Sequence, residues 1–352
     1  MAETTGISWA RSTFNPFIGC TKVGPGCDGC YAEALDARHK WGGATHWGPG
    51  VPRYRTSPSN WKNPLKWNAQ AKFERDAGAL WNGRPGYWPV FCASLADVFD
   101  NEVPQGWRAD LWELIEATPY LSWLLVTKRI GNVRSMVPAH WLQASDGLHP
   151  NRDGFFPPNV RILITVINQE EADRDVPKLL ELPCRNGISY EPALGPIDFA
   201  RLSIKRDPGT IVFGGIPNNA HINALRGYND NGRDVRIEWL IVGGESTQGK
   251  HKARPFRIEW ARSTVRQCRA AGVPVLVKQL GSFVVDRNDA GFDGCEPTAW
   301  PACVEANCEI EHNIWGYLDE HQGADCRVRL KDRAGADLTE WPDDLRVQEF
   351  PA

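Results

Sequence analysis

Short apolar runs of strand length alternate with stretches of helical spacing along most of the chain. Two helices are predicted from such spacing, over residues 106–119 and over residues 258–272, where Gly272 is a typical stop signal. The apolar runs span residues 87–95, 121–128, 159–167, 186–192, 238–246 and 273–281. With an initial strand before Cys20, this pattern predicts about six to seven parallel strands joined by helices.

The expected fold class is therefore α/β. About seven parallel β/α units suit a (β/α) barrel or partial barrel better than a flat doubly wound sheet. The expected barrel domain covers residues 1–281, with a long basic insertion rich in Trp, Pro and Gly at 34–86 and an inserted hairpin or loop at 203–236. Residues 282–352 are expected to form an acidic, irregular C-terminal extension that contains cysteines.

The predicted strands end in polar residues. These are Ser94, Asp97, Thr127, Lys128, Asn168, Glu191, Glu245, Lys278 and Gln279. In β/α barrels the carboxyl ends of the strands form the active face, so a series of polar ends favours a functional site there. The alternative is that strand ends are polar because they meet water.

Composition narrows the class of protein. Charged residues make up 24% of the 352 residues and apolar residues 42%, as in an ordinary soluble globular protein. No apolar run approaches the length of a membrane helix, and the N-terminus lacks the pattern of a secretory signal. We therefore expect a cytoplasmic protein, in which ten cysteines favour metal or redox chemistry over disulfides.

The net charge of −3 conceals an asymmetry. Residues 38–75 carry eight Lys and Arg against one acid, interleaved with Trp and Tyr, whereas residues 286–352 carry sixteen acids against six Lys and Arg. Cations beside aromatic rings are typical of proteins that bind single-stranded nucleic acid, so the first segment could meet an anionic partner. The alternative is that the tryptophans hold a long loop on the barrel and the lysines are a solvated face.

Cys20, Cys27 and Cys30 lie within eleven positions, in CTKVGPGCDGC. A Cys-x2-Cys pair lets two sulfurs reach one metal centre, and the Gly-Pro-Gly turn lets Cys20 fold back toward it. A structural zinc needs four protein ligands, for which His39 or His46 could supply the fourth. In a four-iron cluster, three thiolates leave one iron open. The position at the active face favours the cluster over a structural zinc, and inert buried thiols are the third alternative.

The stretch FNPFIGCTKVGPGCDGCYAE resembles the N-terminal signature of the phage Gp37/Gp68 family, a group of unknown function. The resemblance continues through SLADVFDNEVP, WLLVTKRIGNV, NVRILITVINQEEAD, ISYEPALGPID, EWLIVGGES, CRAAGVPVLVKQLG and DLRVQEFP. More distantly, the chain resembles radical S-adenosylmethionine enzymes of the spore photoproduct lyase-like group, which share a cysteine loop, a Ser/Asp pair and a Thr-Lys pair at matching strand ends.

The resemblance implies that the three cysteines hold a [4Fe–4S] cluster whose open iron binds S-adenosylmethionine, with an external electron donor. It implies cofactor contacts for the matching residues, namely Ser94, Asp97, Thr127 and Lys128. Tyr31, which stands on the other side of Cys30 from the usual aromatic position, is a further candidate for a cofactor contact. Two features depart from those enzymes. The first cysteine gap is six residues rather than three, and Gly29 stands where an aromatic residue is usual.

Three further groups each allow two interpretations. Glu191 and Glu245 could orient substrate or act as acid and base, or could be structural carboxylates paired with an arginine such as Arg254. Cys92 could donate a hydrogen atom, or could belong to the core with Cys184 and Cys268. A second metal could bind the C-terminal group, which could equally be loosely placed thiols. That group is Cys295, Cys303, Cys308 and Cys326, with His312 nearby.

The leading hypothesis is an iron–sulfur enzyme of radical S-adenosylmethionine type that modifies or repairs a nucleic acid or nucleotide. A second is a zinc-stabilised nucleic-acid-binding or interaction protein without radical chemistry. A third is an iron–sulfur protein that uses its open iron as a Lewis acid or sensor.

Overall fold

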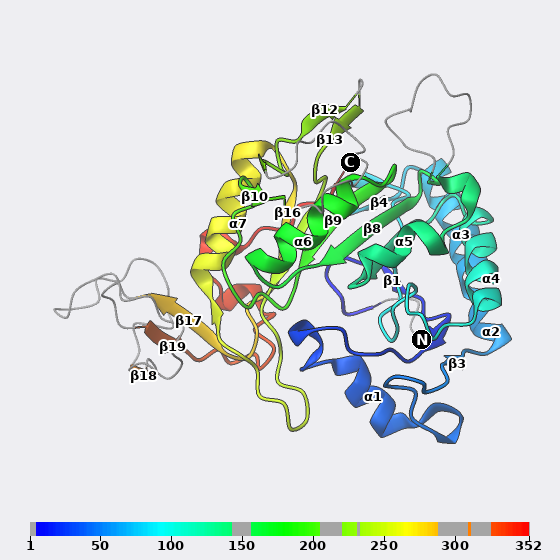
Figure 1. Cartoon of the computed structure of the whole chain (residues 1–352), viewed down its shortest axis with the longest axis horizontal. Helices are drawn as coiled ribbons and strands as arrows, with labels where there is room; N and C mark the ends of the chain where they lie inside the picture. Colours follow the sequence, from blue (N-terminus) through cyan, green and yellow to red (C-terminus); the bar gives the residue numbers. More distant parts are fainter. Residues whose placement is uncertain are drawn as a thin grey trace.

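A seven-stranded parallel sheet forms the centre of the molecule (Figure 1). The computed structural model describes residues 5–142, 156–204, 220–230, 233–287, 309–310 and 325–351. The sheet order is β1–β6–β7–β8–β9–β14–β16, and every neighbouring pair is parallel. Its strands are β1 (Ser12–Thr13), β6 (Pro89–Cys92), β7 (Ser122–Thr127), β8 (Val160–Thr165), β9 (Arg185–Tyr190), β14 (Leu240–Gly243) and β16 (Val275–Gln279). Because the strands follow chain order and the two end strands do not pair, the sheet is an open partial barrel, which confirms the predicted fold class.

Helices connect the strands and lie along the outer side of the sheet (Figure 1). They are α4 (Gln105–Glu116), α5 (Ile130–Met136), α6 (Gln169–Leu180) and α7 (Ile258–Ala271). The two helices predicted from periodicity, α4 and α7, are confirmed to within a few residues. Helix α7 ends where predicted, because Gly272 takes the left-handed conformation at φ 66° that favours glycine.

The strands are apolar on both faces because both faces are covered. Every residue of β8 is buried, including Arg161, whose guanidinium pairs with Glu238 at 2.8 Å. The larger apolar cluster lies between sheet and helices. A smaller cluster includes Trp9, Leu124 and Trp239, and Trp9 also forms part of the wall of the main cavity described below.

The insertion at 34–86 is held by specific polar contacts, which explains its lack of periodicity. Buried Arg53 pairs with Asp100 at 2.8 Å and donates from Nη1 to three backbone carbonyls between residues 46 and 51. The elements in and beside the insertion are β2 (Phe17–Ile18), α1 (Tyr31–His39), β3 (Tyr54–Arg55), α2 (Pro58–Trp61), α3 (Asn63–Asp76), β4 (Leu80–Trp81) and β5 (Arg84–Pro85). Strand β3 pairs with β2, so the insertion is joined to the N-terminal segment.

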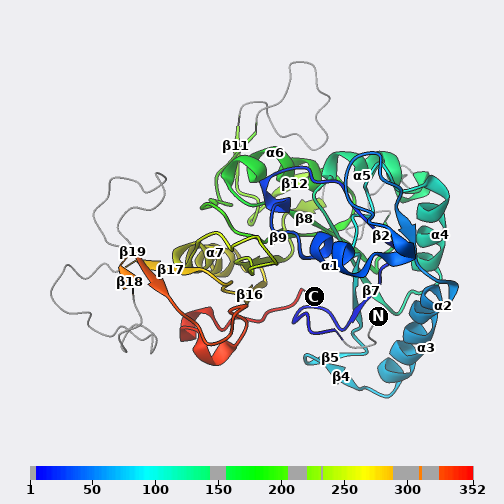
Figure 2. The same cartoon turned by 90° about the horizontal axis from the view of Figure 1, so that it is seen from below.

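The region 203–236 contains two short antiparallel pairs, β10 (Leu202–Ser203) with β11 (His221–Ile222) and β12 (Tyr228–Asp230) with β13 (Arg233–Val235). A second sheet has the order β15–β17–β19–β18 and lies beside α7 (Figure 2). Its strands are β15 (Phe256–Arg257), β17 (Val284–Arg287), β18 (Glu309–Ile310) and β19 (Asp325–Val328).

The end of the chain returns to the barrel. Val277 donates its backbone N–H to Val347, and Glu349 donates to Val275, so this segment pairs with the outer edge of β16. The Trp239 indole also donates to the Glu349 carbonyl at 2.9 Å. The C-terminal extension was expected to be irregular but contains the strands β17, β18 and β19. Its last residues cover the edge of β16, which would otherwise be open.

Candidate functional site

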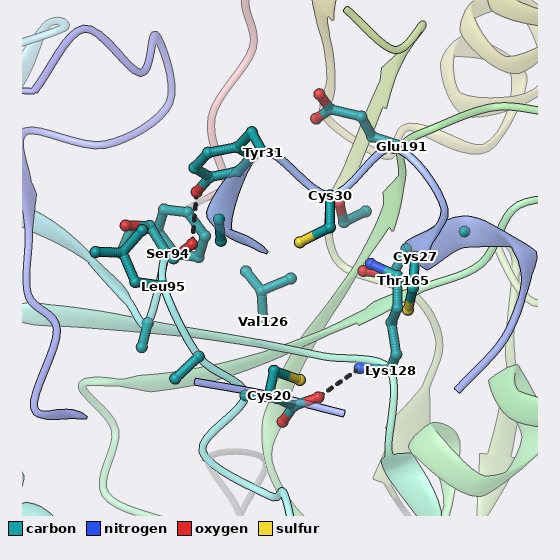
Figure 3. A pocket seen from close by; sticks show the side chains of 18 of the residues that line it. Cys20, Cys27, Cys30, Tyr31, Ser94, Leu95, Val126, Lys128, Thr165 and Glu191 are labelled. Atoms are coloured by element: carbon teal, nitrogen blue, oxygen red, sulfur yellow. Dashed lines mark hydrogen bonds between the residues drawn. The ribbon is translucent and has the colours of Figure 1, made fainter. Parts of the chain in front are cut away.

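One cavity of about 610 Å³ opens at the carboxyl ends of the barrel strands. Cys20, Cys27 and Cys30 line it, and in Figure 3 their sulfur atoms point toward the same open space. The predicted polar strand ends that also line it are Ser94, Asp97, Thr127, Lys128, Glu191, Glu245, Lys278 and Gln279. Asn168 is not in this lining; its side chain caps α6 by accepting from the Glu171 N–H at 3.0 Å.

The cysteine loop is fixed by backbone contacts. Gly19, just before Cys20, has φ 113°, and a Cβ there would lie 2.3 Å from the His46 carbonyl oxygen, so only glycine fits. Its N–H donates to the Leu95 carbonyl at 3.0 Å, which ties the loop to the strand end after β6. Burial raises the pKa of the Cys20 thiol to about 12 and that of Cys30 above its usual value. At Cys20 and Cys30, burial therefore disfavours the thiolate until a partner stabilises it.

The arrangement of the thiols bears on which metal group they could hold. In the part of the chain that the structure describes, no three His, Cys, Asp or Glu side chains are gathered so that they could ligate a single metal ion. Both ring nitrogens of His46 contact backbone carbonyls, those of Pro52 at 2.9 Å and Trp41 at 2.7 Å, while exposed His39 stacks on Trp41. A four-iron cluster does not require the three thiols to meet at one metal position, because its ligand sulfurs bind different irons.

Ser94 is hydrogen-bonded to Tyr31 and to Asn15, a residue that the sequence did not single out. The Tyr31 hydroxyl donates to the Ser94 carbonyl at 2.7 Å (Figure 3). Asn15 donates to the Ser94 hydroxyl at 3.0 Å and accepts from the Leu95 N–H at 2.8 Å. Asn15 belongs to the Asn-Pro pair before the cysteine loop, and its lining of the cavity was missed because it lies outside the cysteine spacing.

Asp97 organises the loop after β7. Its carboxylate accepts from the Thr127 hydroxyl at 2.9 Å, the Lys128 N–H at 3.1 Å and the Arg129 guanidinium at 3.1 Å. The hydrogen bonds of Asp97 and Thr127 are therefore largely made with each other and with the neighbouring backbone. The Lys128 side chain continues toward the cysteine loop, since a Cβ on Gly26 would lie 3.4 Å from its Cε. Arg129, which the sequence did not single out, also lines the cavity.

Glu245 is the centre of a latch across the barrel mouth, made by Glu245, His251 and Arg254. Its carboxylate accepts from the Arg254 guanidinium at 2.9 and 2.7 Å and lies 3.1 Å from His251 Nε2. Arg254 also donates to the Pro25 carbonyl of the cysteine loop at 2.9 Å. Burial alone would raise the pKa of Glu245, but the hydrogen bonds from Arg254 and His251 outweigh it and lower that pKa.

The latch accounts for Gly29. A Cβ at this position would lie 2.6 Å from Cδ2 and 2.7 Å from Nε2 of His251, so the imidazole occupies the space that a side chain at residue 29 would need.

Glu191, across the cavity, pairs with the Lys278 ammonium. Both predicted carboxylates therefore have cationic partners, and Thr165 and Ser189, which the sequence did not single out, add hydroxyls to the lining.

Three further cysteines whose side chains the structure describes are absent from the lining of the cavity. Cys92 is fully buried, and burial raises the pKa of its thiol. Cys184 and Cys268 are also buried. Cys326 belongs to β19, whereas Cys295, Cys303, Cys308 and His312 lie outside the described residues, so a second metal at this group stays a prediction. Among the described helices, none is both long and apolar enough to cross a membrane.

A second pocket of about 450 Å³ adjoins the main cavity, with which it shares Leu95 as a wall. It is built by the insertion, and its lining includes the rings of Trp41 and Tyr54, the Ser57 hydroxyl and exposed Lys66. Trp47, from the same insertion, lines the main cavity. Aromatic, hydroxyl and ammonium groups thus continue from the main cavity onto the insertion.

Comparison with known proteins adds a family and two structural likenesses. The family model described as "Protein of unknown function (DUF5131)" matches residues 4–340. Two solved structures of spore photoproduct lyase are similar to the chain. One is a cysteine-to-serine variant, with 13% identity and a TM-score of 0.37. The other is a double variant with bound AdoMet and dinucleoside spore photoproduct, with 13% identity and a TM-score of 0.36. Each likeness covers 97% of this chain and 74% of the other. No curated protein matches.

Proposed function

Since the chain belongs to the family described as protein of unknown function (DUF5131), we propose a function from its own site: an iron–sulfur enzyme of radical S-adenosylmethionine type that acts on a nucleic acid or nucleotide. The narrower resemblance to the phage Gp37/Gp68 family stays a prediction. The observation that carries the proposal is the convergence of three thiols, and of no fourth cysteine among the described residues, on one cavity at the active end of a partial barrel.

In this proposal Cys20, Cys27 and Cys30 hold a [4Fe–4S] cluster. When bound, such a cluster and S-adenosylmethionine supply one-electron reductive cleavage of the sulfonium to methionine and a 5′-deoxyadenosyl radical, which abstracts a substrate hydrogen atom. The protein's part is to bind, orient and exclude water.

The residues around the cavity suit that part. Lys128 lines the cavity and would pair with the carboxylate of an amino-acid cofactor, whereas Lys278 and Glu191, which also line it, pair with each other. Tyr31 and Ser94 support the opposite wall through their hydrogen bond. Glu245 has its hydrogen bonds filled by the latch, so we assign it to holding the cysteine loop rather than to proton transfer.

A nucleotide substrate is supported by the insertion. Trp47 lines the main cavity, and Trp41, Tyr54 and Lys66 line the second pocket. An aromatic ring for a base and a cation for a phosphate are the groups that single-stranded or extruded nucleotides use. Two other cations of the insertion already form ion pairs within the protein, Arg53 with Asp100 and Arg55 with Asp110.

The test is anaerobic reconstitution followed by analysis of iron, sulfide and zinc, and then incubation with S-adenosylmethionine and dithionite. We expect about four irons and four sulfides per chain, and formation of 5′-deoxyadenosine and methionine. Cys27→Ala should lose the brown colour and most of the iron. Cys268→Ala, a change at a buried cysteine in α7, is the matched control and should keep both.

Each contrary result points to a different function. A colourless chain with one zinc and no sulfide would support the zinc-stabilised alternative. A cluster that forms no 5′-deoxyadenosine under strong reductant would favour a Lewis-acid or sensor role for the open iron. Full iron content in Cys27→Ala would remove this cysteine from the ligand set.

A further inference from the structure

Arg129 lies directly beneath the first cysteine of the loop. Its Nη1 donates to the Cys20 sulfur at 3.4 Å and to Asp97 at 3.1 Å, and its Nη2 donates to the Thr21 carbonyl. Only 8% of its side chain is exposed. A guanidinium has five donors in a rigid plane, so one side chain can fix the sulfur, the backbone after it and the carboxylate below.

Two buried carboxylates lie next to this contact. Arg129 also lies 3.9 Å from Asp100, and Asp100 pairs with Arg53 at 2.8 Å. The carboxylates of Asp97 and Asp100 thus each face one of these two guanidiniums. All four side chains are at most 8% exposed, so water screens them weakly. Buried Arg108 also interacts with both carboxylates. Without Arg129, however, Asp97 would lose the guanidinium that it shares with the Cys20 sulfur.

A negative charge at that place matters if the sulfur belongs to a cluster. Reduction of a cluster adds one negative charge, and its potential depends on net charge, burial and hydrogen bonds to the sulfurs. An N–H···S hydrogen bond from a cation stabilises the reduced state, while unbalanced carboxylates at the same place oppose it.

We propose that Arg129 is the positioning residue for Cys20 and sets the reduction potential of the bound cluster, by holding its sulfur and cancelling the charge of Asp97. The inference rests on the proposed function, since it needs a cluster on Cys20. The step is the addition of one electron to the cluster from a low-potential one-electron donor, with no bond broken.

The test is a redox titration of the full reconstituted chain, with the reduced cluster followed by electron paramagnetic resonance in the absence of S-adenosylmethionine. In Arg129→Gln, which keeps an N–H donor but loses the charge, we expect a more negative potential. At a fixed solution potential the ratio of reduced to oxidised cluster should fall about tenfold, which for one electron is about 59 mV. Arg266→Gln, at an exposed arginine of α7, should leave the potential unchanged.

Arg129→Lys covers the case in which the glutamine variant fails to fold or to assemble a cluster. It keeps the charge and loses the planar fork, so its potential should shift in the same direction by a smaller amount. An assembled cluster with the wild-type potential in Arg129→Gln, or in Arg129→Lys if only that variant assembles, would overturn the inference. Wild-type protein that holds neither iron nor sulfide would instead overturn the proposed function.

Discussion

At the scale of single residues, much of the polar lining is bound to itself. Asp97 accepts a hydrogen bond from the Thr127 hydroxyl. Glu245 accepts from the Arg254 guanidinium, and Glu191 accepts from the Lys278 ammonium. A buried polar group without a hydrogen-bond partner destabilises the folded protein. The polar side chains that line this cavity therefore form hydrogen bonds with one another. Position at a strand end therefore shows that a residue lines the cavity and does not by itself show that it contacts a ligand.

Gly29→Ala tests the contact between the cysteine loop and His251. The added Cβ would meet the imidazole at 2.6 Å, so the ring must turn and give up its hydrogen bond to Glu245. We expect a loss of about 1–3 kcal/mol in the free energy of unfolding, measured by urea denaturation.

Two variants control that experiment. In a His251→Ala background the Gly29→Ala change should cost far less, because the ring is absent and the two changes are coupled. Gly106→Ala, in α4, meets nothing within 4 Å and should stabilise by about 0.5–1 kcal/mol. Equal costs with and without His251 would show that the space at Gly29 is not what the ring restricts.

Sequence reasoning found the three cysteines because their spacing is local. It missed Asn15, Arg129 and His251 because their importance comes from partners far along the chain. Arg129 meets Cys20 across 109 positions, and Asn15 meets Ser94 across 79. Only the fold brings such pairs together, so residue types at those positions carry no signal of their own.

At the scale of elements, the barrel strands and the helices α4 and α7 could be predicted because burial imposes a period and a length. The insertion could not, since its conformation depends on buried Arg53 and on two-residue strands such as β3. The C-terminal segment was also unpredictable, because its pairing with β16 depends on an edge that no local pattern reveals.

The latch is an element whose strength should depend on pH. The pKa of Glu245 is lowered in the folded protein from a usual 4.5. Its stabilisation is therefore complete above the unfolded-state value and is lost as the pH falls through the lower, folded-state value. Glu245→Gln should lower the melting temperature at pH 7, and the difference from wild type should shrink as the pH falls below 4.5.

The measurement is thermal unfolding at a series of pH values between neutrality and strong acid. Glu259→Gln, at a 45% exposed carboxylate on α7 paired with Arg262, is the matched control. Its effect on melting temperature should be small at every pH, since exposed pairs contribute little. A difference between Glu245→Gln and wild type that stays constant through the acid range would show that the carboxylate charge does not hold the latch.

At the scale of the whole molecule, the cavity is shared between the barrel and the insertion. The barrel supplies the polar strand ends, while the insertion supplies Trp47 and, next to it in sequence and space, the second pocket. The alternation of strands and helices predicted the first part. The part supplied by the insertion was indicated by composition alone. Composition predicted a basic, aromatic surface but did not show which cations stay exposed.

Lys66→Glu tests whether that surface binds a polynucleotide. Lys66 is exposed on α3 and lines the second pocket, whereas Lys72 on the same helix pairs with Asp76 at 2.6 Å and is absent from that lining. If the Lys66 ammonium neutralises a phosphate, Lys66→Glu should weaken binding of a fluorescent single-stranded oligonucleotide several-fold at low salt. It should also reduce the slope of log affinity against log salt by about one. The matched change Lys72→Glu alters the net charge by the same amount but lies outside the second pocket, so it should alter both quantities much less. Equal effects of the two variants would mean that the oligonucleotide senses overall charge and that the second pocket is not part of its path.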